Sequence, residues 1–277
     1  MSSHGTSKEF NQKVTSKGEM LIDVLQKMVG NISRQKLKQA LKFGAVWLSR
    51  NGQTNRIRRA KKELLIDDEV HLYFDENILF TDIKPAELIA DENEYSIWNK
   101  PSGMFSQGTK WGDHSSICRW IEINKMPDRQ CYLVHRLDRA TSGLMVVAHS
   151  KKIAVSLSRL FEERLVDKRY KAKVLGEYPR DNLPQKIESE LEGRKAITVI
   201  LASYYEENNN FSELTLQIET GRKHQIRRQL AGAGHAVLGD RLYGDNNSDY
   251  SGDLALKSCY LGFVCPVSKK RKVYQIE

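Results

Sequence analysis

The chain has 277 residues, of which 40% are hydrophobic, and it carries a formal net charge of +9. This size and apolar content allow a sizeable buried core and argue against a disordered chain, and no run of 18 apolar residues is present to span a membrane. The four cysteines form no CxxC pair and the first residues lack the apolar core of a signal peptide, so we expect a reduced, cytoplasmic protein. A monomer is expected, although the sequence does not identify the oligomeric state.

The positive charge is concentrated in one stretch. Residues 34–62 contain ten Lys or Arg and no Asp or Glu, so the rest of the chain is close to neutral. Such a patch favours a polyanionic partner, either nucleic acid or an anionic membrane surface.

Residues 1–18 are polar, and we expect a disordered tail. Residues 19–76 predict two helices followed by short strands, because apolar residues recur at helical spacing up to Gly30 and again from Leu37 to Leu41, and alternate from Val70 to Phe74. The short Leu-rich faces are needed to pack the two helices together, which disfavours a membrane-surface role. The positively charged side chains could form a helix face that is merely solvated, or they could contact phosphates. Because no acidic residues are interspersed among them, we favour phosphate contacts. The predicted RNA-binding patch comprises Arg34, Lys36, Lys38, Lys42, Arg50, Arg56, Arg58 and Arg59.

Residues 77–92 are interpreted as a linker, because Pro85 and an acidic end interrupt the pattern. From residue 93 to 277 buried and alternating strands mix with amphipathic helices. This mixture predicts an α+β domain with a large mixed, mostly antiparallel sheet flanked by helices, next to the small N-terminal helix-helix-strand domain.

Two stretches of the larger domain carry candidate chemistry. Asp138 lies between Arg136 and Arg139 in "HRLDRATSGLMVVA", where a carboxylate beside guanidinium groups is held ionised and suits a nucleophile or base. The alternative is a structural ion pair at the entrance of a strand. The stretch "GRKHQIRRQL" places four more ionisable groups at the start of a predicted helix, and a pair between Arg227 and Asp138 would join segments about 90 residues apart.

The N-terminal stretch resembles the S-four-type RNA-binding module. The similar segments are "ISRQKLKQALKFGAVWLSRNGQ" and "LLIDDEVHLYF". The resemblance implies that the second helix and the loop after it contact RNA.

The larger domain resembles the RluA-type pseudouridine synthases. "HRLDRATSGLMVVA" is similar to their signature, "DKRYKAKV" to a short tyrosine-bearing motif, and "GRKHQIRRQLAGAGHAVLGDRLYG" to their second long motif. "NKPSGM" and "LGFVCPVSKKRKV" complete five segments in the family's order.

The resemblance implies an isomerase that detaches uracil from its ribose, rotates it and rejoins it through carbon, with no cofactor and no metal. It makes Asp138 the nucleophile toward either the sugar or the base, and it makes Tyr170 a surface for the uracil and a candidate acceptor of the carbon 5 proton. Arg227 would pair with Asp138. Substrate-binding roles fall to Arg136, which would hold the target nucleotide out of its helix, and to His135, Arg222 and His224.

The substrate is expected to be structured RNA, most of all large-subunit ribosomal RNA, since by resemblance the appended module is typical of ribosomal enzymes. Transfer RNA is the alternative within the same chemistry. Two other classes stay open: a catalytically silent RNA-binding ribosome-assembly factor, and a metal-dependent hydrolase built on Asp138 with His135 and His224, although their spacing is not typical of zinc.

Overall fold

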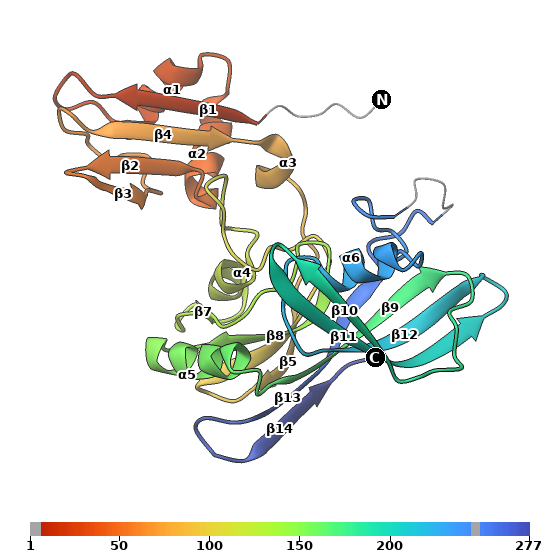
Figure 1. The fold of residues 1–277 in the computed structure, drawn as a ribbon. Coiled ribbons are helices and arrows are strands. Elements are labelled where there is room, and N and C mark those ends of the chain that lie inside the picture. Colours follow the sequence, from red (N-terminus) through yellow and green to blue (C-terminus); the bar gives the residue numbers. More distant parts are fainter. Residues whose placement is uncertain (1–6, 245–249) are drawn as a thin grey trace. The chain divides into compact units, whose positions relative to one another are not determined.

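The structure is a computed structural model that describes residues 7–244 and 250–277 (Figure 1). It divides into two compact units. The small unit contains the chain up to Ile83 together with Gln107–Ile123, and the large unit contains Lys84–Ser106 and Asn124–Glu277. The first boundary falls inside the predicted linker, but the sequence did not predict that residues 107–123 belong with the N-terminal unit.

The small unit is a four-stranded sheet with two helices on it. Its sheet is antiparallel throughout, in the order β1-β4-β2-β3. Its elements are β1 (Lys8–Lys13), α1 (Leu21–Val29), α2 (Arg34–Phe43), β2 (Val46–Arg50), β3 (Gln53–Arg56), β4 (Glu69–Phe74) and the short α3 (Glu76–Leu79), and α4 (Ile117–Asn124) closes the second segment.

The prediction of a disordered tail over 1–18 is wrong for the residues that the structure describes. Strand β1 pairs with β4 from Lys8 opposite Phe74 to Lys13 opposite Glu69. Only Phe10 of this strand packs against the core, because an edge strand has one neighbour and little apolar surface to bury. Its sequence, KEFNQK, therefore gives almost no hydrophobic pattern.

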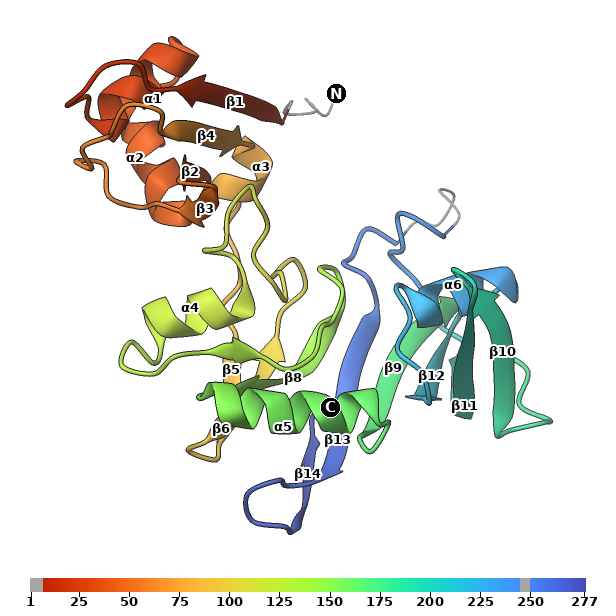
Figure 2. The same ribbon diagram turned by 60° about the vertical axis from the view of Figure 1, so that its left-hand side comes forward.

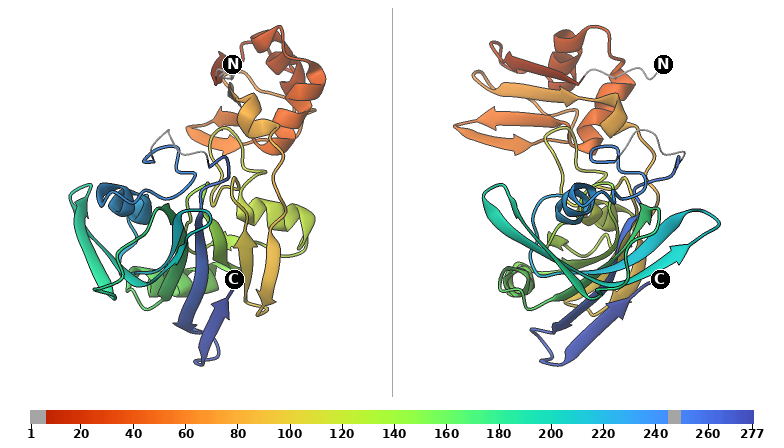
Figure 3. Two further views of the ribbon diagram at one scale, coloured as in Figure 1. Left: turned by 90° about the vertical axis from the view of Figure 1, so that its right-hand side faces the viewer. Right: turned by 45° about the vertical axis from the view of Figure 1, so that its right-hand side comes forward.

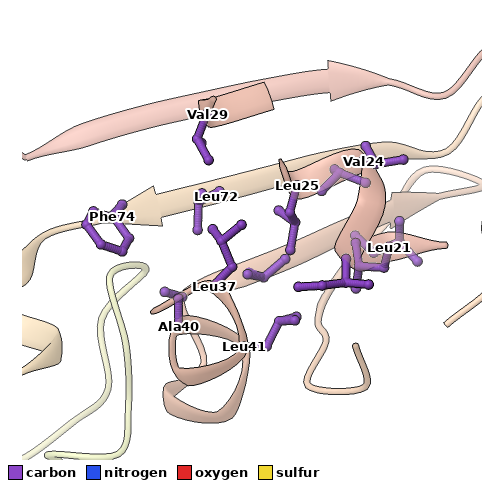
Figure 4. Close-up of a cluster of buried hydrophobic side chains, with 14 of the residues drawn as sticks. Leu21, Val24, Leu25, Val29, Leu37, Ala40, Leu41, Leu72 and Phe74 are labelled. Carbon is purple, nitrogen blue, oxygen red and sulfur yellow. The ribbon is translucent and has the colours of Figure 1, made fainter. Parts of the chain in front are cut away.

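The core of the small unit lies between the sheet and the two helices, as Figure 4 shows. Leu21 and Leu25 of α1 meet Leu37 and Leu41 of α2, so the predicted apolar faces are confirmed. Ser33 caps α2 by accepting a hydrogen bond from the backbone N–H of Lys36. These contacts leave the other face of α2, with its lysines, in solvent.

The large unit is built on one long mixed sheet. In the described residues the strand order is β10-β11-β12-β9-β13-β8-β6-β5, with β14 beside β13 and β7 beside β8. All pairs are antiparallel except β13 with β8, which confirms the predicted class. The strands are β5 (Glu87–Asp91), β6 (Tyr95–Lys100), β7 (Tyr132–Leu133), β8 (Ser142–Ala148), β9 (Asp167–Leu175), β10 (Gln185–Leu191), β11 (Arg194–Glu206), β12 (Phe211–Ile218), β13 (Leu256–Val264) and β14 (Arg271–Gln275).

Two helices cover this sheet at different places. Helix α5 (Lys151–Glu162) packs along β8, as Figure 2 shows, and buries Ile153 and Leu157. Helix α6 (Gln225–Gly232) lies against the curved strands β10 and β11 (Figure 3). There the Gln229 amide nitrogen donates to the carbonyls of Ile187 and Ala196, which ties α6 to both strands. Within residues 7–244 and 250–277, no helix has the length and apolar content needed to cross a membrane.

Candidate active site

Asp138 lies in an irregular segment between β7 and β8, where the chain turns before it enters the sheet. The backbone N–H of Thr141 donates to the Asp138 carbonyl and closes the turn. Ser106 fixes the preceding residue, because its hydroxyl donates to the Leu137 carbonyl and accepts from the Leu137 N–H. The side chain of Asp138 is left 26% exposed, so it is supported from behind and accessible from one side.

A buried lysine supports the same turn. The ammonium of Lys100, at the end of β6, donates to the carbonyls of Pro101, Met104 and Arg139 at 2.9 to 3.3 Å. Burial lowers the pKa of Lys100 to about 7, although the charge of Asp138 acts in the opposite direction. Lys100 therefore connects the "NKP" stretch to the residue that follows Asp138.

A cavity of about 410 Å³ opens at the Asp138 carboxylate, within the size range of ligand pockets. We call it the aspartate pocket. It brings together residues that the sequence analysis selected from three separate stretches: Asp138, Arg136, Tyr170, Arg222, His224 and Arg227.

The structure corrects the ion pair that was expected between Arg227 and Asp138. The guanidinium of Arg227 donates from Nε and Nη2 to the two carboxylate oxygens of Asp240, at 2.7 and 2.6 Å, and not to Asp138. Burial acts to lower the pKa of Arg227, but the bonds to Asp240 outweigh it and the pKa is raised, with a further contribution from the charge of Asp138. The two predicted segments do meet in one pocket, but the direct partner of Arg227 is a third residue.

Among the described residues, His224 is the one basic side chain with a nitrogen within 4.0 Å of the Asp138 carboxylate. Its Nε2 lies 3.7 Å from Asp138 Oδ1, which is too long for a hydrogen bond, while its Nδ1 is 2.9 Å from the Tyr243 hydroxyl. Burial lowers the pKa of His224, partly opposed by Asp138, so the imidazole is mainly neutral at pH 7. His224 adopts left-handed backbone angles at the start of α6, which turns its ring toward Tyr243.

Tyr170 reaches the pocket from β9 and is almost fully buried. Burial raises the pKa of Tyr170, and the charge of Asp138 raises it further. The phenol is therefore un-ionised at neutral pH, and its ring offers an apolar wall to the pocket.

Three predicted substrate-binding residues have different surroundings. Arg136 is exposed at the rim, and Arg222, whose Nε donates to the Lys195 carbonyl, is half-buried. His135 does not line the aspartate pocket. Its ring stacks on Phe161 at 4.2 Å, its Nε2 accepts from the Val146 N–H, and burial lowers its pKa to about 3. A neutral, hydrogen-bonded ring suits a structural role.

A family model described as RNA pseudouridylate synthase matches residues 94–232, half of the chain, and this span contains Asp138, Tyr170 and Arg227. The chain belongs to the RluA-type family of RNA pseudouridine synthases. It is therefore an enzyme of the isomerase class that acts on RNA.

Relatives match different shares of the enzyme. A dual-specificity RNA pseudouridine synthase RluA from Vibrio vulnificus is 30% identical over 66% of this chain and 79% of its own length. An RNA pseudouridine synthase from Aquifex aeolicus is 29% identical over 96% and 92%, respectively. The ribosomal large subunit pseudouridine synthase D of Buchnera aphidicola is 27% identical over 91% and 88%.

The fold is also that of a solved structure. The human protein RNA Pseudouridylate Synthase Domain Containing 1 superposes with a TM-score of 0.58 at 21% identity, over 71% of this chain and 85% of that one. At this identity the likeness concerns the fold alone.

In the folded small unit the basic patch is partly neutralised by acidic residues from other parts of the chain, which the sequence of residues 34–62 does not reveal. Carboxylates from outside residues 34–62 pair with five of its eight members: Asp23 with Arg34, Glu76 with Lys36, Asp68 with Arg50, and Asp113 with both Arg56 and Arg58. Lys38, Lys42 and Arg59 have no ion pair among the described residues. The absence of interspersed acids along the sequence therefore did not predict the local charge.

Asp113 belongs to the second segment of the small unit, which is fastened to the patch by several contacts. Besides the two ion pairs, the backbone N–H of Asp113 donates to the Phe43 carbonyl, and Trp47 Nε1 donates to the Lys110 carbonyl at 3.0 Å. Arg56 stacks on the Trp47 ring at 4.4 Å. Gly44 permits this approach, because a Cβ there would lie 2.6 Å from the Asp113 carboxylate.

Sequence reasoning missed Lys100 and Asp240. Both lie within the quoted motifs "NKPSGM" and "LGDRLYG", and each is an ionisable residue beside Gly or Pro. In such a setting Asp reads as a turn residue and Lys as a solvated one. Only the fold reveals that both are buried next to the pocket.

Proposed function

We propose that the enzyme isomerises a uridine of large-subunit ribosomal RNA to pseudouridine, with Asp138 as its nucleophile and the small unit as an RNA-gripping module. The observation that carries this proposal is the placement of the partly exposed Asp138 carboxylate in a cavity of about 410 Å³, beside Tyr170, Arg136 and Arg222. A base must leave its stack to reach such a pocket, which costs a few kcal/mol that contacts with the pocket offset.

Each pocket residue has a physical role in this proposal. Asp138 attacks the sugar or the base, and the buried guanidinium of Arg227, held by Asp240, lines the same pocket. The un-ionised ring of Tyr170 supplies a stacking surface for uracil, which its surroundings support better than the role of a base. Arg136 is exposed at the rim of the pocket. It would hold the nucleotide in its flipped position by contacting its phosphate, or by contacting the base that the flipped uridine leaves unpaired.

The choice of ribosomal RNA rests on the extent of the matches. The relative named for the ribosomal large subunit aligns with 91% of this chain, whereas the dual-specificity relative aligns with 66%. An alignment over 91% must include much of the small unit, which supports a shared way of gripping RNA. Lys38, Lys42 and Arg59 are the cations of that unit best placed to meet phosphates.

The test is to map pseudouridine in RNA from cells with and without the gene, then to treat the unmodified RNA with the purified enzyme. Wild type restores the missing pseudouridine, and Asp138→Asn does not, although it still binds the RNA. Asp128→Asn, the same change at an exposed aspartate of the same unit, serves as the matched control and keeps full activity. Unchanged modification by Asp138→Asn would refute the assignment of the nucleophile.

The other interpretations give different results in the same experiment. A missing pseudouridine in transfer RNA identifies the alternative substrate, and identical maps with intact RNA binding identify a silent assembly factor. Inhibition by a chelator would favour the hydrolase, since the proposed isomerisation has no metal requirement.

A further inference from the structure

A second cavity, of about 420 Å³, adjoins the aspartate pocket. We call it the lysine pocket, after Lys168 on its wall. The two cavities share Arg136, Tyr170 and Arg222 in their linings. A chain of nucleotides with one base in the aspartate pocket therefore has this second hollow within reach of its backbone.

Lys168 is the unusual feature of this pocket. It precedes Tyr170 by two residues on β9, so both side chains point to the same face of the sheet. The residue is only 8% exposed, yet no hydrogen-bond acceptor or carboxylate contacts its ammonium in the described part of the chain; the Phe161 ring lies 5.9 Å away. The ammonium of this nearly buried residue therefore has no acceptor from the described residues and is free to bind one that a ligand supplies at the wall of the pocket.

The other charged side chains that line the lysine pocket add to its positive charge. Arg136, Arg164 and Arg222 also line the lysine pocket, against the two carboxylates of Glu162 and Glu219. Glu219 lies 3.9 Å from Lys186, on another strand. Burial lowers the pKa of Lys168 and the nearby Arg164 lowers it further, which is the signature of a cation that lacks an anionic partner.

We propose that the lysine pocket binds a phosphate group of the RNA strand next to the target nucleotide, with Lys168 as its central contact. This inference rests on the proposed function, because it takes the base in the aspartate pocket to be that of an RNA uridine. Phosphate supplies the acceptor oxygens that the ammonium lacks, and the arginines at the wall are suited to the same group. The site would hold the strand in register while Arg136 and Tyr170 hold the base.

The first test follows the Lys168 side chain directly. In the full chain with ¹³C-labelled lysine and the Asp138→Asn change, the ε-carbon signal of Lys168 is assigned by its loss in Lys168→Arg. A five-nucleotide RNA with a central uridine should shift this signal and raise the Lys168 pKa, because an anion stabilises the ammonium. This readout needs binding only, so a failure of the catalytic proposal, seen as no pseudouridine from wild type, is distinguished from a failure of this one.

The second test removes the charge from the ligand. The same RNA with neutral methylphosphonate links on both sides of the uridine should bind about tenfold more weakly to Asp138→Asn, as expected for the loss of a charged hydrogen bond. In the double variant with Lys168→Met the two RNAs should bind nearly equally, and Lys168→Arg should restore the difference. Lys173→Met is the matched control, because Lys173 lies on the same strand over the Phe211 ring and lines another cavity.

The outcomes separate the possible sources of phosphate. A Lys168 signal that responds to RNA, with discrimination lost only in Lys168→Met, supports the proposal. A signal that responds to inorganic phosphate but not to RNA overturns it in favour of a free anion, and so does a signal that responds to neither. Equal discrimination between the two RNAs by Asp138→Asn and by the double variant with Lys168→Met also overturns it, provided that thermal unfolding shows the double variant to be folded.

Discussion

The carboxylate of Asp240 receives the guanidinium of Arg227 side-on, and both side chains are almost completely withdrawn from water, at 0% and 5% exposure. The same carboxylate also accepts the backbone N–H groups of Leu242 and Tyr243. Asp240 therefore joins α6 to the loop that follows it and sets the direction from which Arg227 meets the aspartate pocket.

Asp240→Asn should destabilise the enzyme strongly, because it leaves the Arg227 charge buried without a counter-charge. The free energy of unfolding in urea should fall by about 3–5 kcal/mol. Glu163→Gln breaks the exposed pair with Arg159 and should lower the free energy of unfolding far less, because solvent screens this pair. Similar losses in the two variants would show that burial of the Arg227–Asp240 pair does not matter.

Lys100 gives the enzyme a pH-dependent stability. Its pKa is about 7 when folded and near 10.5 when unfolded, so between these values the unfolded chain binds more protons and stability rises with pH. This contribution is complete above pH 10.5 and is lost as the pH falls through 7. We therefore expect the unfolding free energy of wild type relative to Lys100→Met to rise by about 1 kcal/mol per pH unit from 7 to 10.

The control for this series is Lys152→Met, at an exposed lysine on α5. Its difference from wild type should stay flat over the same range. A flat difference for Lys100→Met as well would mean that Lys100 is not titrating in the folded enzyme.

Gly143 allows β8 and β13 to approach each other directly behind the Asp138 turn. Its φ is +110°, and a Cβ there would lie 2.2 Å from the Ser258 carbonyl oxygen. Gly143→Ala should therefore lower the unfolding free energy by about 3 kcal/mol or more and reduce activity by displacing the turn. Gly193→Ala, at φ +70° with nothing within 4 Å, should cost only about 1 kcal/mol.

The basic patch offers two neighbouring arginines with opposite surroundings. Arg59→Glu should weaken RNA binding and lower the slope of log affinity against log salt by about 0.9, with little change in stability, because Arg59 is exposed and has no ion pair among the described residues. Arg58→Glu should also lower stability, because it sets a second carboxylate against Asp113. Filter binding to ribosomal RNA over a salt series and urea unfolding distinguish the two effects.

Lys152→Glu, a charge reversal on α5 of the large unit, is the control for the arginines. It should leave the affinity for RNA, its dependence on salt and the free energy of unfolding unchanged. An equal loss of affinity in all three variants would indicate a general charge effect and would contradict a specific role for the small unit.

The local hydrophobic pattern was sufficient to predict helices and strands that bury one face and expose the other. The apolar faces of α1 and α2 and the alternation along β4 follow periodicity alone, so the sequence located these elements well. It missed β1 and β10, both edge strands whose exposed residues hide the alternation. Strand β1 depends on β4, a partner strand far along the chain, which no local pattern reveals. Strand β10 pairs with the adjacent β11 in a hairpin, and its mainly polar, exposed residues give no clear apolar face.

Most residues that the sequence analysis selected line one pocket, but His135 does not, and the expected pairing of Arg227 was wrong. Asp138, Tyr170 and Arg227 do share a pocket, as the family motifs implied. The partner of Arg227 could not be chosen from sequence, because Asp138 and Asp240 are equally plausible carboxylates until the fold buries one of them. The charge of residues 34–62 was likewise read without Asp113, which is more than 50 residues beyond Arg58 in the chain.

The contacts of residues 107–123 bear on how this protein can be divided. Because Asp113 and Lys110 are held by Arg56, Arg58 and Trp47, the N-terminal module is discontinuous in the gene. A truncation that starts at residue 84 would leave Asp113 without either of its arginines and Lys110 without its tryptophan. A minimal catalytic fragment therefore requires a redesigned bridge between residues 106 and 124 as well as a new N-terminus, and the two modules cannot be exchanged among proteins as simple cassettes.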